Sequence, residues 1–197
     1  MINYAKVIKE TNSKMFNVRD EYKDNTVEQN QNICKSDRLP FSVGAINVAG
    51  DLNVGMMLRS ACLLGAENFY IFGRKKFDAR STVGAENYMN IVQYTFDDPI
   101  HADLSIAMKL QEVSTTRGHT VILCDTGGIE LSSKTTWKFY KDENPLFIFG
   151  SESHGIPDAV SKVFRMKVSI PQRGVLRSFN VSAAMNIICW DYLREMM

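Results

Sequence analysis

The chain has 197 residues, of which 45% are hydrophobic and 23% charged, and its formal net charge is +1 at pH 7. At roughly 150 residues per domain, this length allows one compact domain with an appendage and excludes two full enzymes. The composition is that of a globular chain and excludes disorder throughout. Because no apolar run approaches the ~18 residues of a membrane span, the sequence also excludes an integral membrane protein.

The four cysteines (Cys34, Cys62, Cys124 and Cys189) are scattered, with no CxxC pair and no nearby His to complete a zinc site. Three of them lie in apolar runs, where a buried and reduced thiol is expected. The first residues lack the apolar core of a signal peptide. The sequence therefore predicts a cytoplasmic protein.

Residues 1–38 are polar, carry mixed charge and contain neither Gly nor Pro. Their apolar residues are too sparse to build a core, so we expect one or two helices packed on the main body, or a partly mobile arm. From Pro40 onward the texture changes, and short apolar runs alternate with helical patterns. The main domain is therefore expected to span residues 39–197.

The apolar runs are of strand length and rich in β-branched and aromatic residues. The predicted strands are 41–48, 68–72, 91–94, 120–124, 146–149 and 166–170. Apolar periodicity predicts helices at 53–64, 101–117, 157–164 and 179–196. Strands that are continuously apolar and alternate with helices are typical of an α/β fold with a mostly parallel sheet and helices on both faces.

Two helix starts carry residues that favour capping, namely Asn53 and Ser178, and we expect each to be an N-cap. For Ser178 and Asn180, a role as a capping pair alone is the alternative to a functional role. The helix that follows Ser178 has apolar residues on two neighbouring faces, the second formed by Ala183, Ile187 and Trp190. We expect this unusually broad apolar surface to be covered by something else.

Basic residues gather in two clusters. The first, with no acid among them, comprises Lys162, Arg165, Lys167, Arg173 and Arg177. The second, broken only by Asp78, comprises Arg74, Lys75, Lys76 and Arg80. Positive patches on a nearly neutral chain fit a surface that binds a polyanion. The alternative is ordinary solvated surface.

Several familiar catalytic motifs are absent. The chain has no GxGxxG, so the dinucleotide fingerprint is missing. The sequence GSESHG at 150–155 has phosphate-loop spacing, but Ile156 and Pro157 stand where that loop needs Lys and Ser or Thr. The same segment misses the nucleophile elbow GxSxG because Ser151 replaces its first glycine. A hydrolase or an NTPase is therefore disfavoured.

Three segments remain, each at a strand-to-helix junction, where open α/β sheets bind their ligands. They read NVGMMLR at 53–59, GSESHGI at 150–156 and IPQRGVLRSFNV at 170–181. In the second, Gly150 ends an apolar strand and would let a ligand approach the backbone.

In content, order and spacing, the three segments resemble the SpoU/TrmH family of RNA ribose 2′-O-methyltransferases within the SPOUT superfamily. The third also resembles the eukaryotic tRNA guanosine 2′-O-methyltransferase branch, with Phe179 where the family usually has Leu. The resemblance covers the chain from about residue 41 onward and implies S-adenosylmethionine as cofactor. It also implies a deep C-terminal trefoil knot, an obligate homodimer and RNA as substrate, with tRNA favoured over rRNA.

The resemblance also assigns roles to residues. It implies a catalytic set of Asn53, Arg59, Glu152, Ser178 and Asn180, with Glu152 near Arg59 and orienting it. It implies cofactor contacts from Cys124, Asp125, Gly150, Ile170, Ser178 and Phe179. It implies RNA contacts, for which we take Arg59 together with the basic-loop residues Arg173 and Arg177. No metal is implied, since methyl transfer from a sulfonium needs none.

Arg59 would act without accepting a proton, because a guanidinium is normally too basic for that role. It could hold a phosphate and stabilise the developing alkoxide, although the family proposals include a base. Two other functions stay open. One is a catalytically idle RNA-binding protein of the same fold, which would have no need of the complete catalytic set. The other is an α/β nucleotide-binding module unrelated to RNA, which the basic clusters disfavour.

Overall fold

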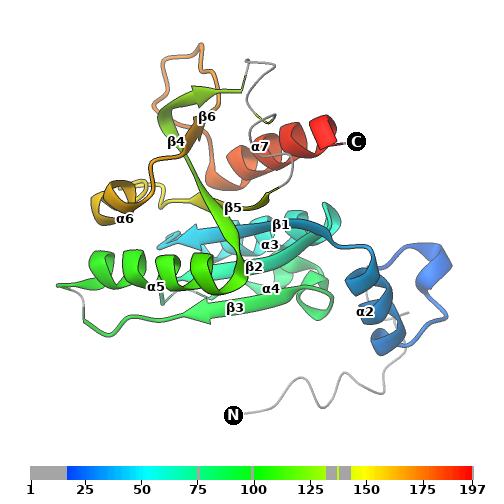
Figure 1. Ribbon diagram of the computed structural model, residues 1–197. Helices are drawn as coiled ribbons and strands as arrows, with labels where there is room; N and C mark the ends of the chain where they lie inside the picture. The colour runs from blue at the N-terminus through cyan, green and yellow to red at the C-terminus, as the bar shows by residue number, and fades with distance from the viewer. Residues whose placement is uncertain (1–16, 75, 99, 132–136, 138–142, 197) are drawn as a thin grey trace.

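The computed structural model describes residues 17–196 except 75, 99, 132–136 and 138–142 (Figure 1). Its strands are β1 Leu39–Ile46, β2 Ala66–Phe72, β3 Asn90–Tyr94, β4 His119–Glu130, β5 Asn144–Phe149 and β6 Lys167–Ser169. They form a six-stranded sheet in the order β3-β2-β1-β5-β4-β6, and neighbouring strands pair in parallel. The predicted α/β fold with a parallel sheet is confirmed.

Helices cover both faces of the sheet (Figure 1). They are η2 Asp20–Tyr22, α2 Val27–Ser36, α3 Asp51–Leu63, α4 Ala79–Thr82, η3 Ala85–Asn87, α5 Ala102–Arg117, α6 Asp158–Val163 and α7 Val181–Met196. Helices α3 and α7 pack against one face, whereas α5 and α6 pack against the other. Among the described helices, none has the length and apolar character needed to cross a membrane.

The apolar strands are explained by burial on both faces. In β5, Phe147 and Phe149 belong to the core beneath α3 and α7, whereas Leu146 and Ile148 belong to the core beneath α5 and α6. Successive side chains of a strand point to opposite faces of the sheet. A strand with helices on both sides therefore buries its side chains on both faces and favours apolar residues throughout.

Strand β4 is longer than predicted because it continues past a bulge. Its register with β6 shifts between Cys124 and Ile129, and both of these residues pair with Val168. The intervening residues Asp-Thr-Gly-Gly at 125–128 are typical of a turn, so the sequence prediction ended the strand at residue 124.

The N-terminal region contains the helix α2, which packs on the main body. The side chain of Gln31 donates to the carbonyl of Asn87 at 2.8 Å, and Arg38 donates to the carbonyl of Tyr88 at 3.0 Å. Residues 1–16 lie outside the described part of the chain. Residues 132–136 and 138–142 also lie outside it. The trefoil knot stays a prediction.

His119 is buried at the start of β4. Its Nε2 lies 3.2 Å from the hydroxyl of Tyr70, and its Nδ1 lies 3.3 Å from the carbonyl of Asn144. Burial is the main cause that lowers the pKa of His119 below its usual value. The ring is therefore a structural group that favours its neutral form.

Candidate active site

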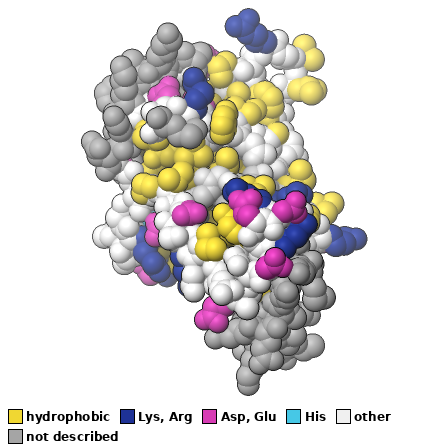
Figure 2. Space-filling view, turned by 90° about the vertical axis from the view of Figure 1, so that its right-hand side faces the viewer, with side chains coloured by type: hydrophobic (Ala, Val, Ile, Leu, Met, Phe, Trp, Pro, Cys, Tyr) yellow, Lys and Arg dark blue, Asp and Glu magenta, His cyan; other side chains and the backbone are white. Residues whose placement is uncertain are grey.

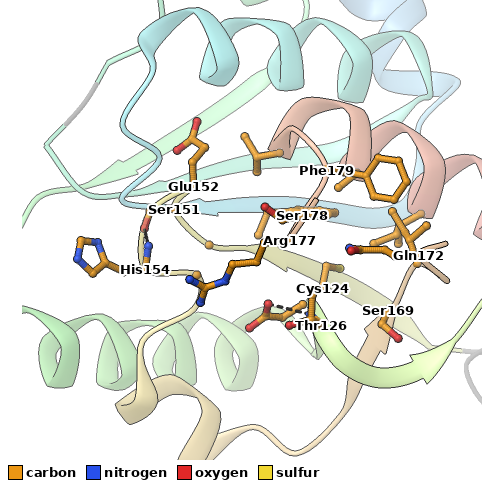
Figure 3. A pocket seen from close by; sticks show the side chains of 18 of the residues that line it. Cys124, Thr126, Ser151, Glu152, His154, Ser169, Gln172, Arg177, Ser178 and Phe179 are labelled. Carbon is orange, nitrogen blue, oxygen red and sulfur yellow. Dashed lines mark hydrogen bonds between the residues drawn. The ribbon is translucent and has the colours of Figure 1, made fainter. Parts of the chain in front are cut away.

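A cavity of about 210 Å³ opens beside the bulge of β4 and the carboxyl ends of β5 and β6, against the first turns of α7 (Figure 3). We call it the strand-end cavity. In Figure 3, Arg177, Ser178 and Phe179 enter it from the loop that precedes α7. The side chain of Glu152 lies on another side of the same space. All the predicted cofactor residues line this cavity, namely Cys124, Asp125, Gly150, Ile170, Ser178 and Phe179.

The bulge in β4 forms one wall of the strand-end cavity, because Asp125 and Thr126 line it. A Cβ at Gly128 would lie 2.6 Å from the backbone of Lys167, so only glycine lets the bulged chain lie this close to β6. Bulges commonly occur beside binding sites, where they redirect side chains. Sequence reasoning placed Cys124 and Asp125 at the cofactor site but missed the bulge, and the Gly127-Gly128 pair is the signal that could have found it.

The segment 150–155 is a tight loop closed by its own backbone. Ser151 N donates to Gly155 O at 3.1 Å, and Gly155 N donates to Ser151 O at 2.8 Å. A Cβ at Gly150 would lie 2.1 Å from the carbonyl carbon of Gly155. The glycine is therefore required by close contact within the chain. Gly150 also lines the strand-end cavity, and the approach of a ligand to its backbone stays a prediction. The loop presents Glu152 at its tip.

Residues from the three sequence segments meet in a hydrogen-bonded chain. Asn53 Nδ2 donates to Glu152 Oε1 at 2.6 Å, and Ala49 N donates to Glu152 Oε2 at 3.1 Å. Asn180 Nδ2 donates to Asn53 Oδ1 at 3.1 Å. These hydrogen bonds lie beyond the ends of β1 and β5, the adjacent strands between which the strand order reverses. Ligands of open α/β sheets bind at such a switch point.

Both predicted N-caps are wrong. The N-cap of α3 is Gly50, and Asn53 lies inside the first turn with its side chain directed to Glu152. Helix α7 begins at Val181 and not at residue 179. Its capping oxygen is Oδ1 of Asn180, which accepts from the backbone N–H groups of Ser182 at 3.0 Å and Ala183 at 3.3 Å. Residue 178 belongs to the preceding loop and lines the cavity instead.

Arg59 lies apart from the other predicted catalytic residues. It lines a second cavity, of about 430 Å³, together with Arg38 and Tyr88, which we call the Arg59 pocket. No hydrogen bond or ion pair joins it to Glu152, although both residues are described. Arg59 follows Asn53 by six positions, which is about 240° around a helix axis. Their side chains therefore point away from α3 in different directions. The expectation that Glu152 orients Arg59 within the subunit is therefore wrong.

The basic loop before α7 is exposed. Arg177 lines the strand-end cavity, whereas Arg173 does not. Neither guanidinium has a hydrogen bond or ion pair with another described residue, so both are available to an anionic ligand. Burial raises the pKa of the Cys124 thiol well above its usual value, which keeps this cavity residue neutral and a poor nucleophile. Within the described residues, no group of His, Cys, Asp and Glu could hold a metal ion.

Comparison with known proteins agrees with this geometry. The model of the SpoU rRNA Methylase family matches residues 40–190, which is more than half of the chain. The chain therefore belongs to the SpoU rRNA methylase family. A relative named tRNA (guanosine(18)-2'-O)-methyltransferase TARBP1, from Mus musculus, is 24% identical over 151 residues, covering 74% of this chain but 9% of that protein.

Solved structures share the fold at low sequence identity. The A. aeolicus TrmH/SpoU tRNA modifying enzyme gives a TM-score of 0.66 at 20% identity, over 86% of this chain and 81% of that one. The SpoU methyltransferase AviRb from Streptomyces viridochromogenes, in complex with AdoMet, gives 0.63 at 22% identity, over 81% and 58%. A structure described as giving insights into 2-OH methylation of C/U34 on tRNA gives 0.62 at 20% identity, over 80% and 98%.

Proposed function

We propose that this protein transfers a methyl group from S-adenosylmethionine to a ribose 2′-hydroxyl of RNA, with tRNA as the favoured substrate, and that it acts in the cytoplasm. The observation that carries the proposal is the hydrogen-bonded chain from Glu152 through Asn53 to Asn180. It joins the three sequence segments beside the strand-end cavity. A protein that only bound RNA would need no such arrangement.

The residues of the strand-end cavity fit S-adenosylmethionine. The side chains of Ile170, Val181 and Ile188 give it an apolar wall for an adenine ring. The carboxylate of Asp125 lies on the lining and suits a cationic sulfonium or an amino group. When bound, S-adenosylmethionine supplies a methyl group on a positively charged sulfur, which a ribose oxygen can attack.

The chain must then hold the ribose and favour loss of the 2′-hydroxyl proton. The carboxylate of Glu152 is fixed by two donors, and Asn53 is fixed between Glu152 and Asn180, so Glu152 and Asn180 act as positioning residues for Asn53. The guanidinium of Arg59 stays charged and would stabilise negative charge on the 2′-oxygen. Ser178 and Arg177, at the mouth of the strand-end cavity, would hold an RNA phosphate.

Arg59 lines a different cavity from the proposed cofactor site, and this separation supports a homodimer with a composite site. The second apolar face predicted for α7 is uncovered in the subunit, with Ile187 39% and Trp190 54% exposed. Figure 2 shows hydrophobic side chains gathered in the upper half of the face that carries the C-terminal end of α7. We infer that a second copy covers α7 and brings Arg59 to its partner's cofactor.

Methyl transfer tests the function directly. Wild-type protein with radiolabelled S-adenosylmethionine should label the tRNA fraction more than the rRNA fraction, and nuclease digestion should map the label to one ribose. Labelling of rRNA alone would show that rRNA is the substrate instead of tRNA, and the proposed reaction would stand. If calorimetry finds no S-adenosylmethionine binding at millimolar concentration, a catalytically idle RNA-binding protein is the function that remains.

Complementation tests the composite site. Arg59→Ala and Asn180→Ala proteins, each nearly inactive, are unfolded, mixed and refolded, and random pairing makes about half of the dimers mixed. Activity well above either parent is expected because each mixed dimer regains one working site. If mixed dimers form and stay inactive, the two residues serve the same site. A monomer by sedimentation would remove the basis of the inference.

A further inference from the structure

The Arg59 pocket has no ligand assigned to it by the proposed cofactor site. Its volume of about 430 Å³ lies within the range of roughly 300–1,000 Å³ that is typical of ligand sites. One wall comes from residues 17–39, and the others come from the C-terminal half of α3 and the segment 82–89. The family match begins at residue 40, so the N-terminal region completes this pocket from outside the matched domain.

The charge of the pocket favours an anion. Three arginines line it, Arg19, Arg38 and Arg59, against one acid, Asp37. Arg19 pairs with a neighbouring glutamate, and Arg38 donates to the backbone of the opposite wall. The guanidinium of Arg59 has no hydrogen bond or ion pair within the described residues. It is therefore the cation that is ready to take a phosphate oxygen.

Much of the remaining lining is apolar. Leu39, Leu63 and Val83 line the pocket with 42%, 77% and 40% of their surface exposed, and a ligand in the pocket would cover this apolar surface.

A free cation beside an apolar wall matches the phosphate and the base of a nucleotide. Proteins that recognise single-stranded RNA take unstacked bases against apolar and aromatic side chains and hold the phosphate with basic ones. We propose that the Arg59 pocket takes one unstacked nucleotide of the RNA substrate, with its phosphate on Arg59 and its base against the wall that the N-terminal region completes. This inference rests on the proposed function and names the part of the chain that selects the nucleotide.

A pair of leucine variants tests the proposal. Leu63→Glu places a carboxylate at the exposed rim of the pocket, where it repels a phosphate and disturbs no buried contact. Leu104→Glu is the matched control, because Leu104 is 54% exposed and lies on α5, which packs on the opposite face of the sheet. The dissociation constants of unfractionated tRNA and of a fluorescent 12-nucleotide single-stranded RNA are measured by anisotropy with full-length protein.

We expect Leu63→Glu to weaken the binding of both RNAs about tenfold, or about 1.4 kcal/mol, and Leu104→Glu to leave their affinities unchanged. Affinity for S-adenosylmethionine should stay the same in both variants, since the strand-end cavity is separate.

Two results would overturn the proposal. One is equal RNA affinity in the two leucine variants while the wild type still methylates RNA, which leaves the proposed function standing. The other is conversion of a dimer to a monomer by Leu63→Glu, which would make the rim a subunit contact. Failure of the wild type to bind S-adenosylmethionine would instead remove the proposed function itself.

Discussion

Asn180 has two roles that can be separated by two substitutions. Its Oδ1 caps α7, and its Nδ2 donates to Asn53 at 3.1 Å. Asn180→Ala removes both contacts, whereas Asn180→Asp keeps a capping oxygen and removes the donor. Loss of a capping side chain costs about 1 kcal/mol. In a chain of this size that lowers the midpoint of thermal unfolding by about 2–4 °C.

The expected outcome is therefore different for stability and for activity. Asn180→Ala should melt about 2–4 °C below the wild type, while Asn180→Asp should melt close to it, because Asp caps helices as well as Asn does. Both should leave little methyl-transfer activity, and the loss of one hydrogen bond of about 0.5–1.5 kcal/mol sets a lower bound of about two- to tenfold on the fall in rate. Calorimetry and single-turnover assays measure the two effects. An active Asn180→Asp protein would refute the positioning of Asn53, and an Asn180→Asp protein as unstable as Asn180→Ala would refute the cap.

Three further predictions concern other parts of the molecule. Alanine at both Arg173 and Arg177 should weaken RNA binding and reduce the slope of log affinity against log salt by about 1 to 2, and an unchanged slope would mean that these arginines touch no phosphate. Gly150→Ala should lower the unfolding free energy by about 1–3 kcal/mol, since its Cβ would lie 2.1 Å from the backbone of the same loop, whereas Gly174→Ala, with nothing within 4 Å, should be neutral. Burial lowers the pKa of His119, so the unfolded chain binds more protons below about pH 6.5 and stability should fall from pH 7 to pH 5. Urea unfolding should show a smaller fall for His119→Gln.

The fold was predictable from the sequence because its signals are local and repeated. The central strands are apolar on both faces, as Phe147 beside Ile148 in β5 illustrates, and this pattern is typical of a parallel sheet covered on both sides. The end of β4 was not predictable in the same way. Its continuation after Cys124 is polar and glycine-rich, and only pairing with β6 makes it a strand.

The sequence predicted which residues form the candidate site, but it did not predict the contacts between them. Sequence segments identified Asn53, Glu152 and Asn180, and the structure joins them by hydrogen bonds. Helix caps were misassigned because several residues near a helix start can cap it, and tertiary contacts with Glu152 decide which side chain turns inward. Arg59 was misplaced relative to Glu152 because a motif gives spacing along the chain, whereas direction depends on the turn of the helix.

The central claim is that this chain methylates a ribose oxygen of RNA. It is tested most directly by locating the label after complete alkaline hydrolysis of tRNA that was incubated with the protein and methyl-labelled S-adenosylmethionine. Alkaline cleavage needs a free 2′-hydroxyl, so a methylated ribose leaves its phosphodiester intact. The account predicts label in alkali-resistant dinucleotides, and loss of that label in Asn53→Ala. Label in mononucleotides would mean that a base is methylated and would contradict the account.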